Sequence, residues 1–325
     1  MALKNQIIST QKVIFVDGIA GGGKNLISYL LASLPKIQHV NPYAAAEQIC
    51  GMVNLKKLSL EIGEDPDLNT WKTFLSKLKN PKNSVKIGLV GKYVELKDSY
   101  KSIAEALIHA GAQNECFVEV DWIHSESIET ENASEKLSSL NGILVAPGFG
   151  ERGVSGKLTA VKYARENNVP FFGICLGMQC AVVEFAQNVL GLSSSSREID
   201  DKTQHPVIDL MEEQKQIEDK GGTMRLGAYS CSLEEGSFAH KAYGTTKISE
   251  RHRHRYEFNS RYKEDFENAG MRASGINPKT GLVEVVEIQN HPFFIGVQFH
   301  PEYKSTVARP HPLFIEFVKA AAKKT

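Results

Sequence analysis

The feature that most constrains the fold is a change of pattern at Val85, after which short apolar segments alternate with stretches of helical spacing. Four of these segments are short, predominantly apolar runs of strand length, at 85–90, 117–123, 142–146 and 170–174. Strands without polar alternation are typical of a parallel sheet that is covered by helices on both faces. Two further β-rich runs, 282–288 and 293–298, precede a final helix at about 312–322. The sequence therefore predicts an α/β domain with a doubly wound, mainly parallel sheet.

The residues before this domain follow a different pattern, and we expect the chain to consist of an N-terminal segment, 1–83, and a domain, 84–325. The segment opens with a strand-like run and the sequence Gly-Ile-Ala-Gly-Gly-Gly-Lys-Asn at 18–25. These residues fit the phosphate-loop pattern GxxxxGK[ST] except that Asn25 replaces the Ser or Thr that would contact magnesium. The candidate phosphate-binding residues are Gly18, Gly23 and Lys24. A Gly-rich turn without bound nucleotide is the alternative, because one βα unit cannot build a nucleotide domain.

Composition excludes several classes of protein. Lysine plus arginine and aspartate plus glutamate each number 38, so the formal net charge is zero and gives no general attraction to nucleic acid or an anionic membrane. No apolar run approaches the roughly 18 residues of a spanning helix, and the N-terminus lacks the apolar region of a signal peptide. The five cysteines show neither metal-binding spacing nor a disulfide framework. We therefore expect a cytoplasmic enzyme with reduced thiols, no metal in the domain, and no nucleic-acid or membrane partner.

The predicted strand at 170–174 ends at a cysteine flanked by small residues, in the frame Gly173-x-Cys175-x-Gly177. This frame is typical of a nucleophile elbow, a sharp strand-to-helix turn, with Cys where many hydrolases carry Ser. A helix that begins at the nucleophile directs its N-terminal amides and its dipole toward the sulfur, which favours the thiolate. An isolated Cys after an apolar strand is usually a small buried hydrophobe, so the frame alone does not establish a nucleophile.

A base for this thiol is predicted near the C-terminus, where an apolar strand leads into His300-Pro301-Glu302. A thiolate nucleophile requires a proton acceptor and a group that orients the acceptor. Because they are two residues apart on extended chain, the imidazole and the carboxylate can share one face of it. Together, the elbow and this segment favour a catalytic triad of Cys175, His300 and Glu302 over a structural role for each residue alone.

Two segments resemble the signatures of class I glutamine amidotransferases, Phe172-Gly-Ile-Cys-Leu-Gly-Met-Gln179 and Val297-Gln-Phe-His-Pro-Glu302. Three others resemble the glutamine amidotransferase domain at the C-terminal end of CTP synthases: Val90-Gly-Lys-Tyr-Val-Glu-Leu-Lys-Asp-Ser-Tyr100, Gly221-Gly-Thr-Met-Arg-Leu-Gly227 and Glu250-Arg-His-Arg-His-Arg-Tyr-Glu257. The resemblance covers about 68–319. It implies the class I glutamine amidotransferase fold and a glutaminase that uses the triad on L-glutamine.

The resemblance also implies an oxyanion hole made of two backbone amides, those of Gly148 and Leu176. In this family one donor follows the nucleophile, and the other comes from a Gly-Gly-Phe-Gly loop. Here that loop reads Pro147-Gly-Phe-Gly150, and proline has no N–H to donate. The donor position itself is kept by Gly148, so we expect the hole to be intact.

Three further residues are implied to bind glutamine. Arg255 is the candidate for the α-carboxylate, because a guanidinium fork matches a carboxylate. Glu198 is the candidate for the α-ammonium, and Phe149 for the pocket wall. Arg255 ends a basic run, 251–255, for which a solvated face or a phosphate patch is the alternative interpretation.

CTP synthases are activated by GTP, so the resemblance implies GTP as an allosteric activator. Lys101, Arg152 and Arg225 lie in matching motifs and are the candidate GTP-binding residues, with ordinary surface or structural ion pairs as the alternative. No cofactor is implied for the glutaminase domain, and ATP, UTP and magnesium are expected only for a complete synthetase. A synthetase chain or domain is an expected partner, because the residues before Val85 are too few to build one. The sequence leaves open whether the chain forms a homo-oligomer.

The expected activity is hydrolysis of glutamine to glutamate and ammonia, for a ligase that uses ATP to aminate UTP to CTP. One alternative is an amidotransferase subunit of another synthetase, and the CTP-synthase-like motifs at 221–227 and 250–257 argue against it. The other alternative is a non-catalytic regulatory or scaffolding copy of the domain. The intact triad argues against that interpretation.

Overall fold

The computed structural model describes residues 67–210 and 224–324, and the chain divides into two compact units, Met1–Lys72 and Thr73–Thr325. The predicted phosphate loop with Gly18, Gly23 and Lys24 lies outside the described residues. Helix α4 (Asn69–Lys79) begins where the Asp67 side chain accepts a hydrogen bond from the Asn69 amide at 2.9 Å. None of the described helices is both long and apolar enough to cross a membrane.

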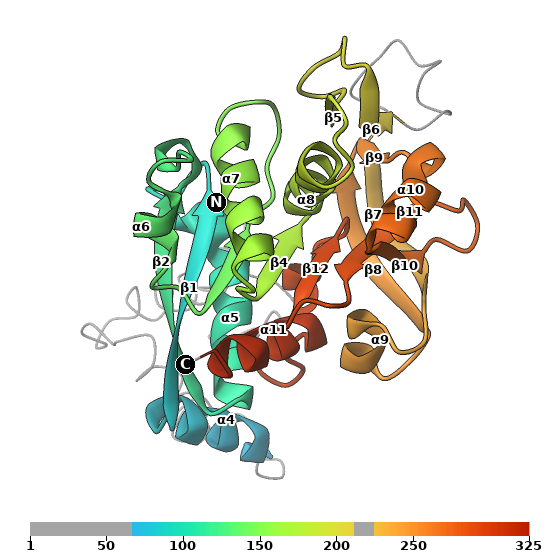
Figure 1. Ribbon diagram of the computed structural model, residues 1–325. Helices are drawn as coiled ribbons and strands as arrows, with labels where there is room; N and C mark the ends of the chain where they lie inside the picture. Colours follow the sequence, from blue (N-terminus) through green and yellow to red (C-terminus); the bar gives the residue numbers. More distant parts are fainter. Residues whose placement is uncertain (1–66, 211–223, 325) are drawn as a thin grey trace, which may run out of the picture. The chain divides into compact units, whose positions relative to one another are not determined.

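The second unit is built on a nine-stranded mixed sheet, with the strand order β2-β1-β3-β4-β12-β11-β10-β7-β8 (Figure 1). Its strands are β1 (Asn83–Gly91), β2 (Cys116–His124), β3 (Gly142–Val145), β4 (Phe171–Ile174), β7 (Arg225–Leu233), β8 (Lys247–His254), β10 (Met271–Ile276), β11 (Val283–Ile288) and β12 (Phe294–Val297). Strands β2 to β12 in this order are parallel, which confirms the predicted doubly wound half. From β12 onward each neighbour is antiparallel. The predicted β-rich runs correspond to β11 and β12, whereas β7, β8 and β10 were not predicted.

Helices cover the two faces of the parallel half, because successive residues of its buried strands point to opposite faces. Ile143 and Phe171 belong to one core cluster, whereas Leu144 and Phe172 belong to the other, and all four are fully buried. The first cluster includes α6 (Ala133–Leu137), α7 (Val154–Glu166), α8 (Leu176–Asn188) and α10 (Lys263–Ala269). The second includes α5 (Lys101–Gln113), α9 (Phe238–Tyr243) and α11 (Pro312–Ala322). This two-faced burial explains why the central strands β3 and β4 read as continuous apolar runs.

A second, three-stranded sheet has the order β5-β6-β9, and it packs against α8. Its strands are β5 (Ser194–Ser196), β6 (His205–Leu210) and β9 (Tyr256–Phe258). A single residue, Arg255, separates the end of β8 in the large sheet from the start of β9 in the small one. Glu198 follows β5 by two residues. The small sheet therefore carries two of the predicted glutamine-binding residues toward α8.

Candidate active site

Cys175 occupies the sharp turn between β4 and α8, with φ 53° and ψ −104°. A non-glycine residue at positive φ is strained, and the surrounding contacts hold it there. Its amide donates a hydrogen bond to the Val297 carbonyl on β12 at 2.7 Å. A Cβ at Gly173 would lie 2.7 Å from the Gly177 carbonyl group, and a Cβ at Gly177 would overlap the carbonyl oxygen of Val145. The two glycines of the frame are therefore required by close backbone approach, as the elbow predicts.

The predicted base, His300, lies in the segment that follows β12, the neighbour of β4 in the sheet. Strands β4 and β12 are parallel partners, with Ile174 opposite Val297, so the chain that follows β12 passes beside the elbow. Within that segment His300 Nδ1 lies 2.8 Å from Glu302 Oε1, and both side chains are almost fully buried. The His300 amide donates to the Arg251 carbonyl at 2.7 Å, which fixes the segment against β8. The structure thus brings the three predicted triad residues together.

The protonation of this group follows from its burial and its charges. Burial alone lowers the pKa of His300, but the Cys175 thiolate and the Glu302 carboxylate together raise that pKa to about 11. The charged imidazolium is therefore favoured beside the sulfur, as expected for a thiolate–imidazolium pair. Burial raises the pKa of Cys116, Cys231 and Cys180, the last to about 11, so these thiols stay protonated near neutral pH.

Two glutamine side chains form a chain of hydrogen bonds that ends at the Cys175 sulfur. Sequence analysis assigned neither of them a role. Gln298 is fully buried, and its Nε2 lies 3.7 Å from Cys175 Sγ. Gln179 donates to Gln298 Oε1 at 3.2 Å and to the Tyr256 carbonyl at 2.9 Å. The spacing was a usable signal, since Gln179 lies one helical turn after the nucleophile and Gln298 lies two residues before His300. Together they orient an amide donor toward the Cys175 sulfur.

The loop 146–150, here called the oxyanion loop, lies beside the start of α8. A Cβ at Gly148 would be 3.4 Å from the side chain of Leu176, the first residue of that helix. The first amides of a helix have no partner within the helix, so the Leu176 N–H can serve a ligand. The far end of the loop is fixed because the Gly150 amide donates to Glu198 Oε1 at 2.8 Å. The two predicted donors therefore flank the nucleophile.

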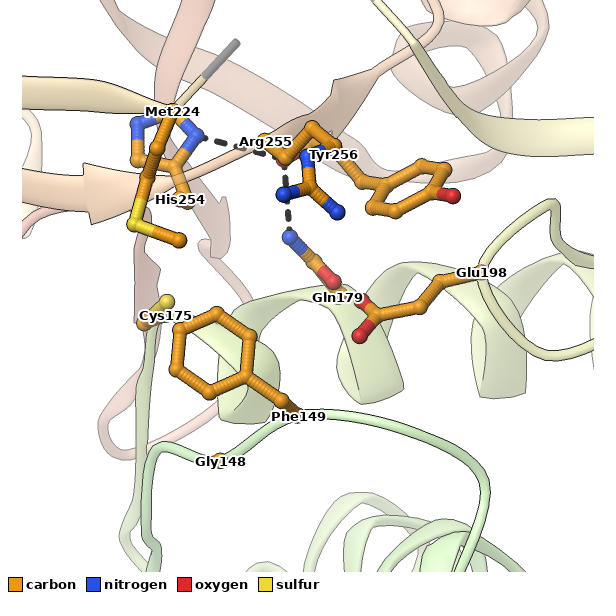
Figure 2. Close-up of a pocket in the computed structure, with 9 residues that line it drawn as sticks. All are labelled: Gly148, Phe149, Cys175, Gln179, Glu198, Met224, His254, Arg255 and Tyr256. Carbon is orange, nitrogen blue, oxygen red and sulfur yellow. Dashed lines mark hydrogen bonds between the residues drawn. The ribbon is translucent and has the colours of Figure 1, made fainter. Parts of the chain in front are cut away.

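A small cavity opens at the nucleophile (Figure 2). Its lining residues are Gly148, Phe149, Cys175, Gln179, Glu198, Met224, His254, Arg255 and Tyr256. All three residues predicted to bind glutamine are among them. In Figure 2 the guanidinium of Arg255 and the carboxylate of Glu198 lie on one side of the view, with Cys175 on the other and the Phe149 ring below. The cavity thus presents charged groups of both signs together with the thiol.

The basic run at 251–255 has some side chains in solvent and others in the pocket wall, so each of the two interpretations holds for part of it. On β8 the burial alternates, so His252 and His254 are buried while Arg251 and Arg253 are exposed. The Arg253 guanidinium lies over the Phe149 ring, 5.8 Å from its centroid. The run is therefore solvated on one face and built into the pocket wall on the other, with Arg255 in the cavity lining.

The family of this chain is shown by a match to a known sequence profile. The sequence profile for the class-I glutamine amidotransferase domain matches residues 95–320. The chain belongs to the class-I glutamine amidotransferase family. The resemblance drawn from its motifs is thereby confirmed.

Within this family, the chain is similar to several CTP synthases. The CTP synthase of Flavobacterium johnsoniae is 61% identical over 281 residues, which are 86% of this chain and 52% of that protein. The CTP synthase of Christiangramia forsetii is 63% identical over 270 residues, 83% of this chain and 50% of that protein. The chain thus spans about half the length of these curated relatives. The solved glutaminase domain of Trypanosoma brucei CTPS with bound acivicin is 38% identical, with a TM-score of 0.70, covering 74% of this chain and 95% of that one.

The predicted GTP-binding residues of this amidotransferase differ in exposure. Lys101 is half-buried at the start of α5, and the Arg152 side chain is 51% exposed. The Arg225 side chain is only 5% exposed, and its guanidinium pairs with Glu284 at 2.8 Å and with Glu257 at 3.6 Å. Arg225 therefore has the structural ion-pair role that was the alternative, and its assignment as a GTP contact is disfavoured.

The carboxylate of Glu284 also lies near two histidines that could, by composition, hold a metal ion. His254 Nδ1 lies 3.2 Å from the Tyr256 carbonyl and therefore donates to it, which leaves Nε2 to accept from His252 Nδ1 at 2.9 Å. Burial, with the nearby Arg225 charge, lowers the pKa of His252 to about 2 and of His254 to about 3. His252 Nδ1 and both ring nitrogens of His254 are thus engaged in a neutral histidine pair. The guanidinium of Arg225 beside this pair disfavours a further cation.

Proposed function

We propose that this chain hydrolyses L-glutamine to glutamate and ammonia through a covalent intermediate on Cys175. The observation that supports this most directly is the nucleophile turn at the start of α8, with a buried His300–Glu302 pair beside it. A thiolate, a proton carrier and an orienting carboxylate are the parts that amide hydrolysis through a thioester requires. The solved Trypanosoma brucei domain, 38% identical, bears the name glutaminase.

In the proposed reaction the Cys175 sulfur attacks the side-chain carbonyl carbon of glutamine and forms a C–S bond. The oxyanion accepts hydrogen bonds from the amides of Gly148 and Leu176. The C–N bond then breaks, and His300 gives its proton to the leaving nitrogen, so ammonia departs and a γ-glutamyl thioester remains. Water, losing a proton to His300, attacks the thioester; the C–S bond breaks, and glutamate and the thiolate are released.

Substrate recognition is proposed to use the charged side of the cavity. Arg255 would bind the α-carboxylate by a bidentate contact, and Glu198 would hold the α-ammonium. One oxygen of the Glu198 carboxylate already accepts from the Gly150 amide, so this residue would couple substrate binding to the oxyanion loop. Phe149 would pack along the aliphatic part of glutamine.

The ammonia is proposed to serve ATP-dependent amination of UTP to CTP on a synthetase domain or chain, since the curated relatives bear the name CTP synthase. GTP is proposed as the activator of glutamine hydrolysis, with Lys101 and Arg152 as contacts. The Arg152 guanidinium lies over the exposed Tyr93 ring, 5.4 Å from its centroid, and 3.3 Å from Glu126. A cation beside an exposed ring is a suitable site for a phosphorylated purine.

The test is glutamate formation from L-glutamine by the full chain, with and without GTP, beside Cys175→Ala as a matched control. We expect turnover that GTP increases and that Cys175→Ala abolishes. Arg152→Ala should keep the basal rate and weaken the response to GTP. Glutamate formation no greater than that of Cys175→Ala, with GTP present, would contradict the proposal and favour a non-catalytic copy of the domain.

A further inference from the structure

A buried lysine lies behind the oxyanion loop. Lys157, in the first turns of α7, is completely buried, and its Nζ donates a hydrogen bond to the Ala146 carbonyl at 2.7 Å. Buried lysines are almost always paired with a carboxylate, because an uncompensated charge is costly inside a protein. Across the described residues no carboxylate forms an ion pair with Lys157, so its partner is a backbone dipole. Because burying this charge is costly, we expect Lys157 to have a role besides packing.

The carbonyl that Lys157 holds belongs to Ala146, two residues before Gly148, the proposed oxyanion donor. Ala146 follows β3, and its amide donates to the Val90 carbonyl at 3.0 Å, so both of its backbone polar groups are fixed. Pro147 comes next, and its ring restricts the conformation of the Ala146 backbone and sets its own φ. A Cβ at Gly148 would lie 3.7 Å from Lys157 Nζ. The Lys157 ammonium therefore lies close to Gly148, the residue whose amide is the proposed oxyanion donor.

A second lysine holds the other end of the loop. Lys92, also buried, donates from Nζ to the Phe149 carbonyl and, at 3.4 Å, to the Gly150 carbonyl. The oxyanion loop is therefore anchored at both ends by ammonium groups that bind its carbonyls. The proposed donor, the amide of Gly148, lies between the anchored carbonyls of Ala146 and Phe149. Each anchor also brings a positive charge near a site where negative charge develops.

We propose that Lys157 is a positioning residue of the oxyanion hole: through the Ala146 carbonyl it sets the direction of the Gly148 N–H, and its charge stabilises the oxyanion. This inference rests on the proposed glutamine hydrolysis. Charge fixed in a water-poor site acts more strongly on a transition state than the same charge in water. A neutral side chain of equal length would fill the space and lose both effects.

The charge on Lys157 depends on pH near neutrality. Burial lowers its pKa to about 8, opposed by the thiols of Cys180 and Cys175 and assisted by the ammonium of Lys92, which are the titratable groups that face it. Because the ammonium is the active form, the proposed effect is present below pH 8 and is lost as the pH rises through it. The pKa of His300 is raised to about 11, so its titration is separable from that of Lys157.

The first experiment compares Lys157→Met with Lys162→Met in the full chain, measuring steady-state glutamate formation. Lys162 is a half-buried lysine of the same helix and serves as the matched control. For Lys157→Met we expect kcat to fall by about tenfold or more, short of the roughly 10²–10³ that a lost oxyanion donor costs, with KM little changed. Lys162→Met should behave as wild type. A wild-type kcat in Lys157→Met, or a change confined to KM, would overturn the proposal.

A second measurement separates positioning from a structural role. Alkylation of Cys175 by iodoacetamide displaces iodide and forms no oxyanion, so its rate in Lys157→Met should stay within about twofold of wild type. Equal losses in alkylation and turnover would overturn the proposal and assign Lys157 to the fold.

If Lys157→Met does not fold, the wild-type profile of kcat against pH decides. We expect a decline with an apparent pKa near 8, because the Lys157 ammonium loses its proton there. A kcat that stays constant up to about pH 9.5 would overturn the inference while leaving glutamine hydrolysis in place. A wild-type chain that forms no glutamate at any pH would instead refute the proposed function, and the inference with it.

Discussion

Replacing Arg225 with methionine tests whether this arginine is an internal counter-charge or a nucleotide contact. Its guanidinium lies 2.8 Å from Glu284 and 3.6 Å from Glu257, and none of the three side chains is more than 5% exposed. The substitution Arg225→Met keeps most of the aliphatic volume of the side chain and removes its charge. Two buried carboxyl groups would then have no cation beside them.

Breaking a buried ion pair by removing one partner costs about 3–5 kcal/mol, and we expect Arg225→Met to lose that much free energy of unfolding at high pH. Burial already raises the pKa of Glu257 to about 8 and also raises that of Glu284, even though Arg225 lowers both. Without the guanidinium both pKa values rise further. A carboxyl group with a raised pKa contributes stability below its unfolded pKa and loses it as the pH rises through the folded pKa. The deficit should therefore be smallest near pH 5 and largest above pH 8.

The assay is urea unfolding of the full chain followed by far-UV circular dichroism at about pH 5.5 and pH 8.5. Arg152→Met is the matched control, since that side chain is 51% exposed and its pair with Glu126 is worth about 0–1 kcal/mol. A deficit for Arg225→Met no larger than that of the control, or one that does not grow with pH, would refute this reasoning. It would also reopen the assignment of Arg225 as a GTP contact.

Three further substitutions test the site. Pro147→Gly should change turnover by less than about tenfold, because Gly148 keeps its amide; a change of about 10²–10³, as for a lost donor, would mean that the loop is arranged differently. Gly177→Ala, whose Cβ overlaps the Val145 carbonyl, should lower the free energy of unfolding by about 1–3 kcal/mol together with turnover, and wild-type values for both would contradict the tight elbow. Glu302→Gln removes a carboxylate that raises the pKa of His300, so kcat should fall by about 10² or more, and unchanged turnover would exclude Glu302 from the triad.

The parallel half of the sheet was predictable because its strands are buried on both faces and read as apolar runs. In the antiparallel half, β11 and β12 were expected as β-rich runs, but β7, β8 and β10 were not, for a physical reason that β8 shows clearly. Its burial alternates with the period of a strand, but three of its inward residues are Glu250, His252 and His254. They are buried among Arg225, Tyr243 and one another, so no hydrophobic periodicity marks them. The ionisable residues of this strand suggested that it is exposed to solvent, although half of them are buried.

The triad was predictable because a thiol, an imidazole and a carboxylate occur in local frames that few structural roles require. The roles of Lys92 and Lys157 behind the oxyanion loop were not predictable, because the sequence does not distinguish a buried lysine from an exposed one. The same ambiguity left two roles open for Arg225, a GTP contact or a structural ion pair, and its burial beside Glu284 favours the second. Whether a cation faces solvent or a carbonyl is decided by packing between elements far apart in the sequence.

The most direct test of the central claim is the site of covalent labelling by a diazo-ketone analogue of glutamine, mapped by peptide mass spectrometry in the full chain. The proposed mechanism predicts one added group, on Cys175, that excess L-glutamine prevents and that Cys175→Ala abolishes. Burial raises the pKa of Cys116, Cys180 and Cys231, so these thiols should remain unlabelled. Labelling of any of these, or of Cys50, at a rate equal to that of Cys175, or a Cys175 that does not react, would contradict the assignment of Cys175 as the nucleophile.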